Sequence, residues 1–259
     1  MKKILVIGES CWDTFVYGGC ERLAPDAPVP VFNTIKTSRN MGMAGNVYTN
    51  IQHISNFQVG LRSGPNWESV TKTRYIDDTS NHMFLRVDEG DKNYERCDIE
   101  SLNYMDYDAV VISDYDKGFL SELDIETICR NHPLTFLDTK KVLGRWVYSA
   151  TYIKLNSYES RNNVPKEIRE KIEDKLISTQ GPKGCFFKGE RFYVKKVDIR
   201  DVAGAGDTFL AALVCKYLET NNIIKAIQAG NKAATDVVQQ RGVSVPRNKN
   251  QPMFNGNKV

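Results

Sequence analysis

The chain has 259 residues, of which 41% are hydrophobic and 26% are charged, and its formal net charge at pH 7 is +3. This composition is ordinary for a globular protein and excludes the disordered and fibrous classes. The 35 basic and 32 acidic residues are spread along the chain without a long block of one sign, which argues against a nucleic-acid partner. At this length, a single domain over residues 1–259 is the expected organisation.

The cysteines, the histidines and the N-terminus restrict the metal chemistry and the location of the protein. None of the six cysteines forms a C-x-x-C pair, and the three histidines are scattered, so zinc-ligand spacing is absent. The apolar run after Met1 stops at Glu9, too early for a signal peptide, and no run reaches the roughly 18 apolar residues of a membrane span. The sequence therefore predicts a cytoplasmic protein without a membrane partner.

The first predicted element is a buried strand, because residues 4–8 form a continuous apolar run that is closed by a glycine. Two later stretches, near residues 14–36 and 73–88, contain short strand-like runs bounded by Gly, Pro and Asp. They predict a small β-sheet lid over a cleft. A homodimer through this lid is a further expectation.

Further along the chain, strands and helices alternate. Apolar runs that end at a polar residue predict strands at residues 109–112, 134–137, 152–153 and 175–177. Helical periodicity predicts helices at residues 121–131, 166–174 and 207–219. This alternation is typical of an α/β fold with a doubly wound, mostly parallel sheet flanked by helices.

Polar residues follow three of the predicted strands. Asp114, Asp138 and Asn156 stand where these apolar runs end. Because open parallel sheets bind ligands beyond the carboxyl ends of their strands, all three side chains are candidates for one cleft. Asp and Asn are also common as helix caps and turn formers, and this alternative stays open here.

The most informative segment is Asp201-Val-Ala-Gly204-Ala205-Gly206-Asp207-Thr-Phe, directly before a predicted amphipathic helix. Small residues let backbone N–H groups approach an anion, and a helix N-terminus favours negative charge. Asp207 either caps this helix or accepts a proton from a hydroxyl that attacks phosphorus, an effect typically worth about 10²–10⁴-fold. The residues alone leave both roles open.

This segment resembles the C-terminal signature of the ribokinase/PfkB carbohydrate kinases. The resemblance implies a ribokinase-like fold and ATP as the phosphoryl donor. It also implies that Asp207 is the catalytic base, and that the backbone at Gly204, Ala205 and Gly206 stabilises the transferring phosphoryl group.

Two further segments resemble the nucleotide side of the same family. Asn156-Ser-Tyr-Glu159 is similar to the N-x-x-E motif, which implies that Asn156 and Glu159 order Mg²⁺ near the phosphates. Thr179-Gln-Gly181-Pro-Lys-Gly184 is similar to a T-x-G-x-x-G segment beside the nucleotide, although a turn at the end of a strand would use the same glycines.

A later helix completes the resemblance on this side. The stretch around Asn231 resembles the helix that flanks the adenine, although helix packing explains its alanines equally well. The family resemblance also allows a monovalent cation as a second ion.

The N-terminal half resembles one branch of the family, the kinases of D-glycero-D-manno-heptose 7-phosphate. The segments that carry this likeness are Gly8-Glu-Ser-Cys-Trp-Asp13, Arg22-Leu-Ala-Pro25-Asp-Ala-Pro28-Val-Pro30-Val, Gly42-Met-Ala-Gly-Asn46-Val, Leu85-Arg86-Val-Asp88 and Ser113-Asp-Tyr-Asp-Lys117-Gly. The resemblance implies that Asp13, Gly42 and Asn46 hold sugar hydroxyls. It makes Arg86 and Lys117 candidates for a sugar phosphate. Without the resemblance, these residues are ordinary turn residues and surface charges.

The sequence also departs from this branch. Glu9 stands where Asp is usual, Met43 replaces a glycine, and the segment between Asn46 and Thr71 is short. A kinase of another sugar therefore stays open, as does a catalytically silent protein that binds a sugar or a nucleotide. A P-loop kinase and a Rossmann dehydrogenase are disfavoured because neither glycine motif is present.

Overall fold

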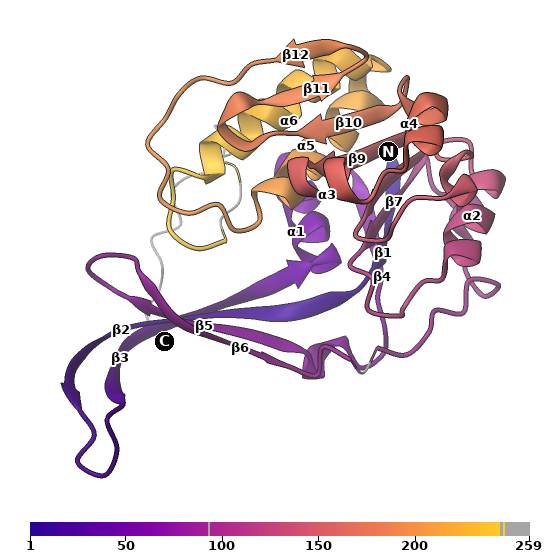
Figure 1. The fold of residues 1–259 in the computed structure, drawn as a ribbon. Helices are drawn as coiled ribbons and strands as arrows, with labels where there is room; N and C mark the ends of the chain where they lie inside the picture. Colours follow the sequence, from indigo (N-terminus) through magenta and orange to yellow (C-terminus); the bar gives the residue numbers. More distant parts are fainter. Residues whose placement is uncertain (93, 244–245, 247–259) are drawn as a thin grey trace.

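Two β-sheets organise the chain in the computed structural model, which describes residues 1–92, 94–243 and 246 (Figure 1). The larger sheet has eight strands in the order β12-β11-β10-β9-β8-β7-β1-β4, and the smaller has four in the order β3-β2-β5-β6. In Figure 1 the smaller sheet extends away from the larger sheet and its helices. The predicted fold class, a mostly parallel sheet with a small separate β-sheet, is confirmed.

The larger sheet contains every strand that was predicted from a buried apolar run. Its parallel strands are β1 (Lys3–Gly8), β4 (Gln58–Arg62), β7 (Ala109–Asp114), β8 (Thr135–Thr139), β9 (Tyr152–Asn156) and β10 (Leu176–Thr179). Antiparallel strands β11 (Cys185–Phe187) and β12 (Glu190–Phe192) complete one edge. Strands such as β1 and β7 contain continuous apolar runs because both faces of the sheet are covered.

Helices cover the two faces of this sheet. One layer comprises α1 (Ala44–Ile54), α5 (Ala205–Thr220) and α6 (Ile223–Val237); the other comprises α2 (Glu122–Asn131), α3 (Ser157–Asn162) and α4 (Lys166–Ile172). Successive side chains of β1 point into two different cores. Ile4 packs in the core beneath α1, α5 and α6, and Leu5 packs in the core beneath α2 and α4. The predicted helices α2, α4 and α5 are confirmed. Among the described helices, none is long and apolar enough to cross a membrane.

The smaller sheet is larger than the sequence predicted. It consists of β2 (Ser10–Leu23), β3 (Pro30–Met43), β5 (Thr71–Asp77) and β6 (Met83–Glu89). β2 and β3 each run for 14 residues instead of the short strands expected, and they form the ribbon that projects in Figure 1. Most of β3 is exposed and polar, so it lacks the apolar periodicity that reveals a strand.

The short segment between Asn46 and Thr71 holds the rest of α1, then β4 and the 3₁₀ turn η1 (Trp67–Ser69). The chain thus passes directly from the edge of the large sheet into the small one. The remaining 3₁₀ turns are η2 (Tyr104–Asp106), η3 (Arg145–Val147) and η4 (Gly181–Lys183).

Glu9 ties the junction of β1 and β2 to the loop that follows β7. This side chain is fully buried, and its carboxylate accepts hydrogen bonds from the backbone N–H groups of Tyr115 (2.8 Å), Lys117 (2.9 Å) and Phe119 (3.4 Å). The residue that departs from the family pattern therefore has a structural task, because it fixes the loop that carries Tyr115.

Candidate active site

The N-terminus of α5 lies at the centre of the candidate site. Gly204 precedes the helix with φ +75°, in the left-handed region that favours glycine. A Cβ at this position would come within 2.7 Å of the Asn46 side-chain nitrogen. Gly204 therefore permits both the turn and the close approach of α1, and the first-turn N–H groups of α5 have no partner further back in the helix.

Asp207 is the third residue of α5, and its carboxylate does not cap the helix. Instead, Asn46 Nδ2 donates to Asp207 Oδ2 at 2.8 Å, and the Tyr115 hydroxyl donates to Oδ1 at 3.0 Å. Only 8% of the residue is exposed. The helix-cap alternative is therefore wrong, and side chains from two distant segments hold this carboxylate in place.

Burial raises the pKa of Asp207 to about 6. Hydrogen bonds from Asn46 and Tyr115 and the charge of Lys154 counter that effect, while the charge of Asp138 adds to it. A carboxylate with a pKa in this range is a better proton acceptor than an ordinary aspartate and is still ionised at neutral pH.

Two lysines bring positive charge to the same place. Lys154 is only 4% exposed and donates to Asp138 Oδ2 at 2.6 Å. A Cβ on Gly206 would lie 3.1 Å from Lys154 Nζ, so this ammonium group sits against the first turn of α5. Lys140 Nζ binds Glu159 and lies 3.9 Å from Asp138 Oδ1. Sequence reasoning missed both lysines, although a lysine within an apolar strand is a signal for Lys154.

A cavity of about 590 Å³ joins these groups. Its lining includes the predicted residues Asn156, Thr179, Gly181, Gly184, Gly204, Ala205, Gly206, Asp207 and Asn231. Val194, Val197, Ile199 and Val202 add an apolar side. A polar end with cations beside an apolar end suits a ligand that carries phosphates on an organic group.

The predicted metal residues form a capping box at the start of α3. Asn156 Oδ1 accepts from the N–H groups of Tyr158 and Glu159, both at 2.9 Å, and the Glu159 carboxylate accepts from Asn156 N at 2.8 Å. Asn156 lines the cavity and Glu159 does not. The helix-cap alternative for Asn156 is thus confirmed, and it coexists with a position in the site.

The carboxylate oxygens in this cavity suit a metal ion that is held by few protein side chains. Within residues 1–92, 94–243 and 246, no group of three or more His, Cys, Asp and Glu side chains gathers as a metal cage. Asp138 lines the cavity, and its Oδ1 is buried without a hydrogen-bond partner. Mg²⁺ at phosphate sites is often held by one or two carboxylates together with phosphates and water, so this oxygen is a suitable ligand.

Asp114, the third polar residue at a strand end, does not line this cavity. Its carboxylate accepts from Thr139 and lies 3.3 Å from Lys141 Nζ. Burial, together with the charge of Glu9, raises the pKa of Asp114 to about 6.

The residues predicted for sugar hydroxyls lie where the small sheet meets the large one. Asp13 is buried on β2 and paired with Arg74. Gly42 lies on the neighbouring strand β3, opposite Cys11, where a Cβ would come within 2.3 Å of Asp13 Oδ2. Asn46 lies in the first turn of α1 and donates to Asp207. The chain thus brings the predicted sugar residues toward the predicted base.

The residues predicted for a sugar phosphate already have carboxylate partners. Arg86 donates from Nε and Nη2 to Asp88 at 2.7 and 2.8 Å. Lys117 Nζ lies 2.6 Å from Asp91. Lys117 lines a pocket of about 630 Å³ together with both aspartates, whereas Arg86 does not. A phosphate group at this place would have to compete with these ion pairs.

Comparison with known proteins gives matches over most of the chain. The family model for the pfkB family carbohydrate kinases matches residues 109–250. The bifunctional protein HldE of Helicobacter pylori (strain J99) is 30% identical over 296 residues, which cover 93% of this chain and 64% of that protein. The chain therefore spans less than two thirds of that relative's length.

Solved structures share the fold. The nucleoside kinase of Methanocaldococcus jannaschii, an archaeal member of the ribokinase family, has a TM-score of 0.70 at 18% identity, covering 95% of this chain and 94% of that one. The ribokinase of Thermotoga maritima has a TM-score of 0.67 at 15% identity, with coverages of 94% and 95%.

Proposed function

Because the chain belongs to the pfkB family of carbohydrate kinases, we propose that Asp207 activates a sugar hydroxyl for attack on the γ-phosphate of ATP. The observation that carries this proposal is the buried Asp207 carboxylate beside the first turn of α5. A binding protein has no need of a proton acceptor at an anion site. A kinase needs both in one place.

The transfer itself requires the acceptor oxygen, the phosphorus and the leaving oxygen of ADP to lie in line. As the acceptor oxygen forms its bond to phosphorus, the hydroxyl proton passes to the Asp207 carboxylate and the bond from phosphorus to the leaving ADP breaks. The N–H groups at the start of α5 and the ammonium of Lys154 stabilise the charge on the phosphoryl oxygens. The low exposure of Lys154 strengthens this effect, because little water screens the charge.

Mg²⁺ belongs to the same proposal. When bound, it would neutralise part of the charge on the phosphates of ATP. Asp138 is the residue of this chain best suited to hold it, because Oδ1 is buried and has no hydrogen-bond partner. Asn156 and Glu159 remain proposed partners of the ion and its water, since they begin the helix beside the cavity.

For the acceptor, we favour the anomeric hydroxyl of heptose 7-phosphate. This choice rests on the resemblance of the N-terminal half to heptose 7-phosphate kinases. Asp13, Gly42 and Asn46 are the proposed contacts of the sugar hydroxyls. Because Asn46 also donates to Asp207, a hydroxyl bound beside Asn46 would lie close to the base.

One observation favours a second candidate, a kinase of an unphosphorylated sugar. Arg86 and Lys117 are both ion-paired with aspartates, so neither is a ready partner for a phosphate group. An acceptor without a phosphate would leave these pairs undisturbed.

ADP release with Mg-ATP, measured on heptose 7-phosphate, hexose phosphates and free sugars, tests these proposals. We expect the highest kcat/KM on heptose 7-phosphate. Arg86→Ala and Lys117→Ala should weaken phosphorylated acceptors by about tenfold or more while leaving free sugars nearly unchanged. Equal losses on both classes would remove the proposed phosphate site. No turnover on any acceptor, together with sugar binding unchanged in Asp207→Asn, would favour a silent binding protein.

A homodimer through the small sheet remains part of the proposal. Large apolar side chains are exposed on this sheet, namely Leu23, Ile35, Met83, Phe84 and Leu85. Exposed apolar side chains on several strands of one sheet favour an interface. Light scattering should give twice the chain mass, and a monomer at micromolar concentration would contradict the proposal.

A further inference from the structure

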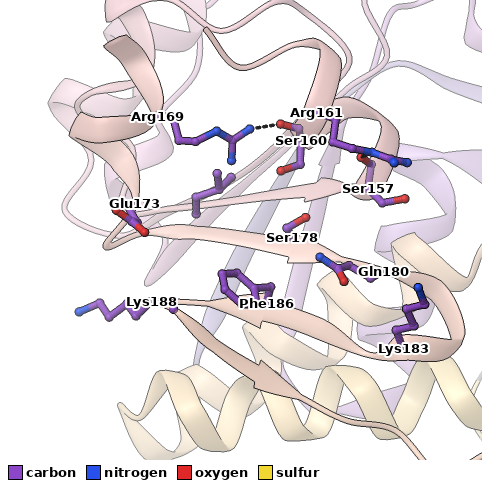
Figure 2. A pocket seen from close by; sticks show the side chains of 12 residues that line it. Ser157, Ser160, Arg161, Arg169, Glu173, Ser178, Gln180, Lys183, Phe186 and Lys188 are labelled. Atoms are coloured by element: carbon purple, nitrogen blue, oxygen red, sulfur yellow. Dashed lines mark hydrogen bonds between the residues drawn. The ribbon is translucent and has the colours of Figure 1, made fainter. Parts of the chain in front are cut away.

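A second pocket lies behind the candidate active site, on the other face of β10. It measures about 450 Å³ (Figure 2). Successive residues of a strand point to opposite faces of the sheet. Accordingly, Ser178 and Gln180 line this pocket, whereas Thr179 between them lines the active-site cavity. The two cavities are thus separated by the end of one strand.

The helices beside this pocket are short. α3 and α4 have six and seven residues and form one wall. Ser178 and Phe186 lie below them on β10 and β11, and Phe186 is 37% exposed (Figure 2). An aromatic ring left open on a sheet face provides an apolar surface for a ligand.

Four cations line this pocket, and only one acid does. The cations are Arg161, Arg169, Lys183 and Lys188, and the acid is Glu173. Among the ion pairs of the described residues, none involves any of the four cations.

The two arginines are oriented by neutral groups. Arg169 donates to the Ser160 carbonyl oxygen (Figure 2). Arg161 Nε donates to the Ser157 carbonyl oxygen at 2.9 Å. These bonds restrict the side chains without neutralising their charge. The pocket therefore combines an excess of positive charge with donors that are already held in place.

We propose that this basic pocket binds a small organic phosphate. Guanidinium groups match phosphate oxygens with paired N–H donors, and ammonium groups add charge. Phe186 offers a surface for the organic part of the molecule. The volume lies within the usual range for small-molecule sites, about 300–1,000 Å³. The site is distinct from the cavity that contains Asp207, although both lie beside Ser157.

A ligand in this pocket would act on the active site through the turn at residues 180–184, which borders both cavities. Gln180 and Lys183 line the pocket, while Gly181 and Gly184 of the same turn line the active-site cavity. Gln180 N donates to the Gly184 carbonyl oxygen at 2.7 Å, which closes this turn. This step rests on the proposed kinase function: if the turn contacts the nucleotide, as the family resemblance implies, an anion in the pocket changes the affinity for ADP.

Calorimetric titration with pyrophosphate, in the presence of saturating Mg-ADP, tests the binding site. Arg161→Glu/Lys188→Glu reverses two charges of the pocket without altering the turn. We expect pyrophosphate to bind this variant at least about tenfold more weakly than the wild type. Lys166→Glu/Lys171→Glu is the matched control, because both lysines are exposed on α4 outside the pocket. The control should bind like the wild type.

Equal affinity in the wild type and Arg161→Glu/Lys188→Glu, or no binding to the wild type, would overturn the site. Because this titration needs no turnover, its result is independent of the kinase proposal. Coupling is tested by ADP affinity with and without pyrophosphate. Any competition between pyrophosphate and ADP inside the active site affects the wild type and Arg161→Glu/Lys188→Glu equally. We therefore expect pyrophosphate to change the ADP affinity of the wild type at least about threefold more than that of the variant. Equal changes in the two proteins would overturn the coupling.

Discussion

Asp207→Asn is expected to abolish most sugar phosphorylation while making the protein more stable. Loss of a general base typically lowers kcat by about 10²–10⁴-fold. The variant keeps the size of the side chain, and its amide oxygen still accepts a hydrogen bond from Asn46. Nucleotide binding should therefore change little, and steady-state ADP release together with ADP titration measures both effects.

The gain in stability follows from the sign of the pKa shift. Burial raises the pKa of Asp207 from 3.8 to about 6, so the folded protein binds this proton more tightly than the unfolded chain does. Stability then falls as the pH rises from about 4 to about 6, and the full cost, up to about 3 kcal/mol, is present above that range. Asn carries no charge, so the thermal midpoint of Asp207→Asn should exceed that of the wild type at pH 7.5 but not at pH 4.

Tyr115→Phe is the companion variant, because it keeps the carboxylate and removes one hydrogen bond that lowers the pKa of Asp207. We expect the acidic limb of kcat/KM near pH 6 in the wild type, because the pKa of Asp207 is about 6, and in this variant it should move upward by about one pH unit. An unchanged limb, or an Asp207→Asn protein with wild-type turnover, would contradict the assignment of Asp207 as the base.

The sequence predicted the parts of this protein that depend on local pattern. Buried strands such as β1 and β7 contain continuous apolar runs, and the glycines before Asp207 indicate a turn at a helix N-terminus. The full length of β3 escaped prediction because most of its residues face solvent and show no period-two pattern. Its length follows from pairing with β2, which is a property of the folded chain.

The same distinction applies within the candidate site. Asp207 was found from its own segment, but its partner Tyr115 lies 92 residues away in the chain. No local pattern marks such a contact. Arg86 and Lys117 were chosen for their charge, and only the fold reveals that Asp88 and Asp91 already bind them. Charge along a sequence therefore predicts a potential ligand, whereas its availability depends on tertiary neighbours.

Glu9→Ala is expected to lower the free energy of unfolding by about 3–5 kcal/mol. The substitution leaves the N–H groups of Tyr115, Lys117 and Phe119 without their acceptor, and each unsatisfied buried donor costs about 1–3 kcal/mol. Relief of repulsion with Asp114 offsets part of this loss, because the charge of Glu9 raises the pKa of that residue. Urea unfolding measures the change.

Glu9→Gln separates the hydrogen bonds from the charge. Its amide oxygen can still accept hydrogen bonds from the N–H groups of Lys117 and Phe119, which share Glu9 Oε1 in the wild type. The N–H group of Tyr115 loses its acceptor, Glu9 Oε2. We therefore expect a smaller loss of stability than in Glu9→Ala, with faster hydrogen exchange at the Tyr115 amide than at Lys117. This loop also carries the Tyr115 hydroxyl that contacts Asp207. We therefore expect turnover to fall in Glu9→Gln as hydrogen exchange at the Tyr115 amide becomes faster. Unchanged stability and exchange in Glu9→Ala would show that the loop keeps its position without this carboxylate.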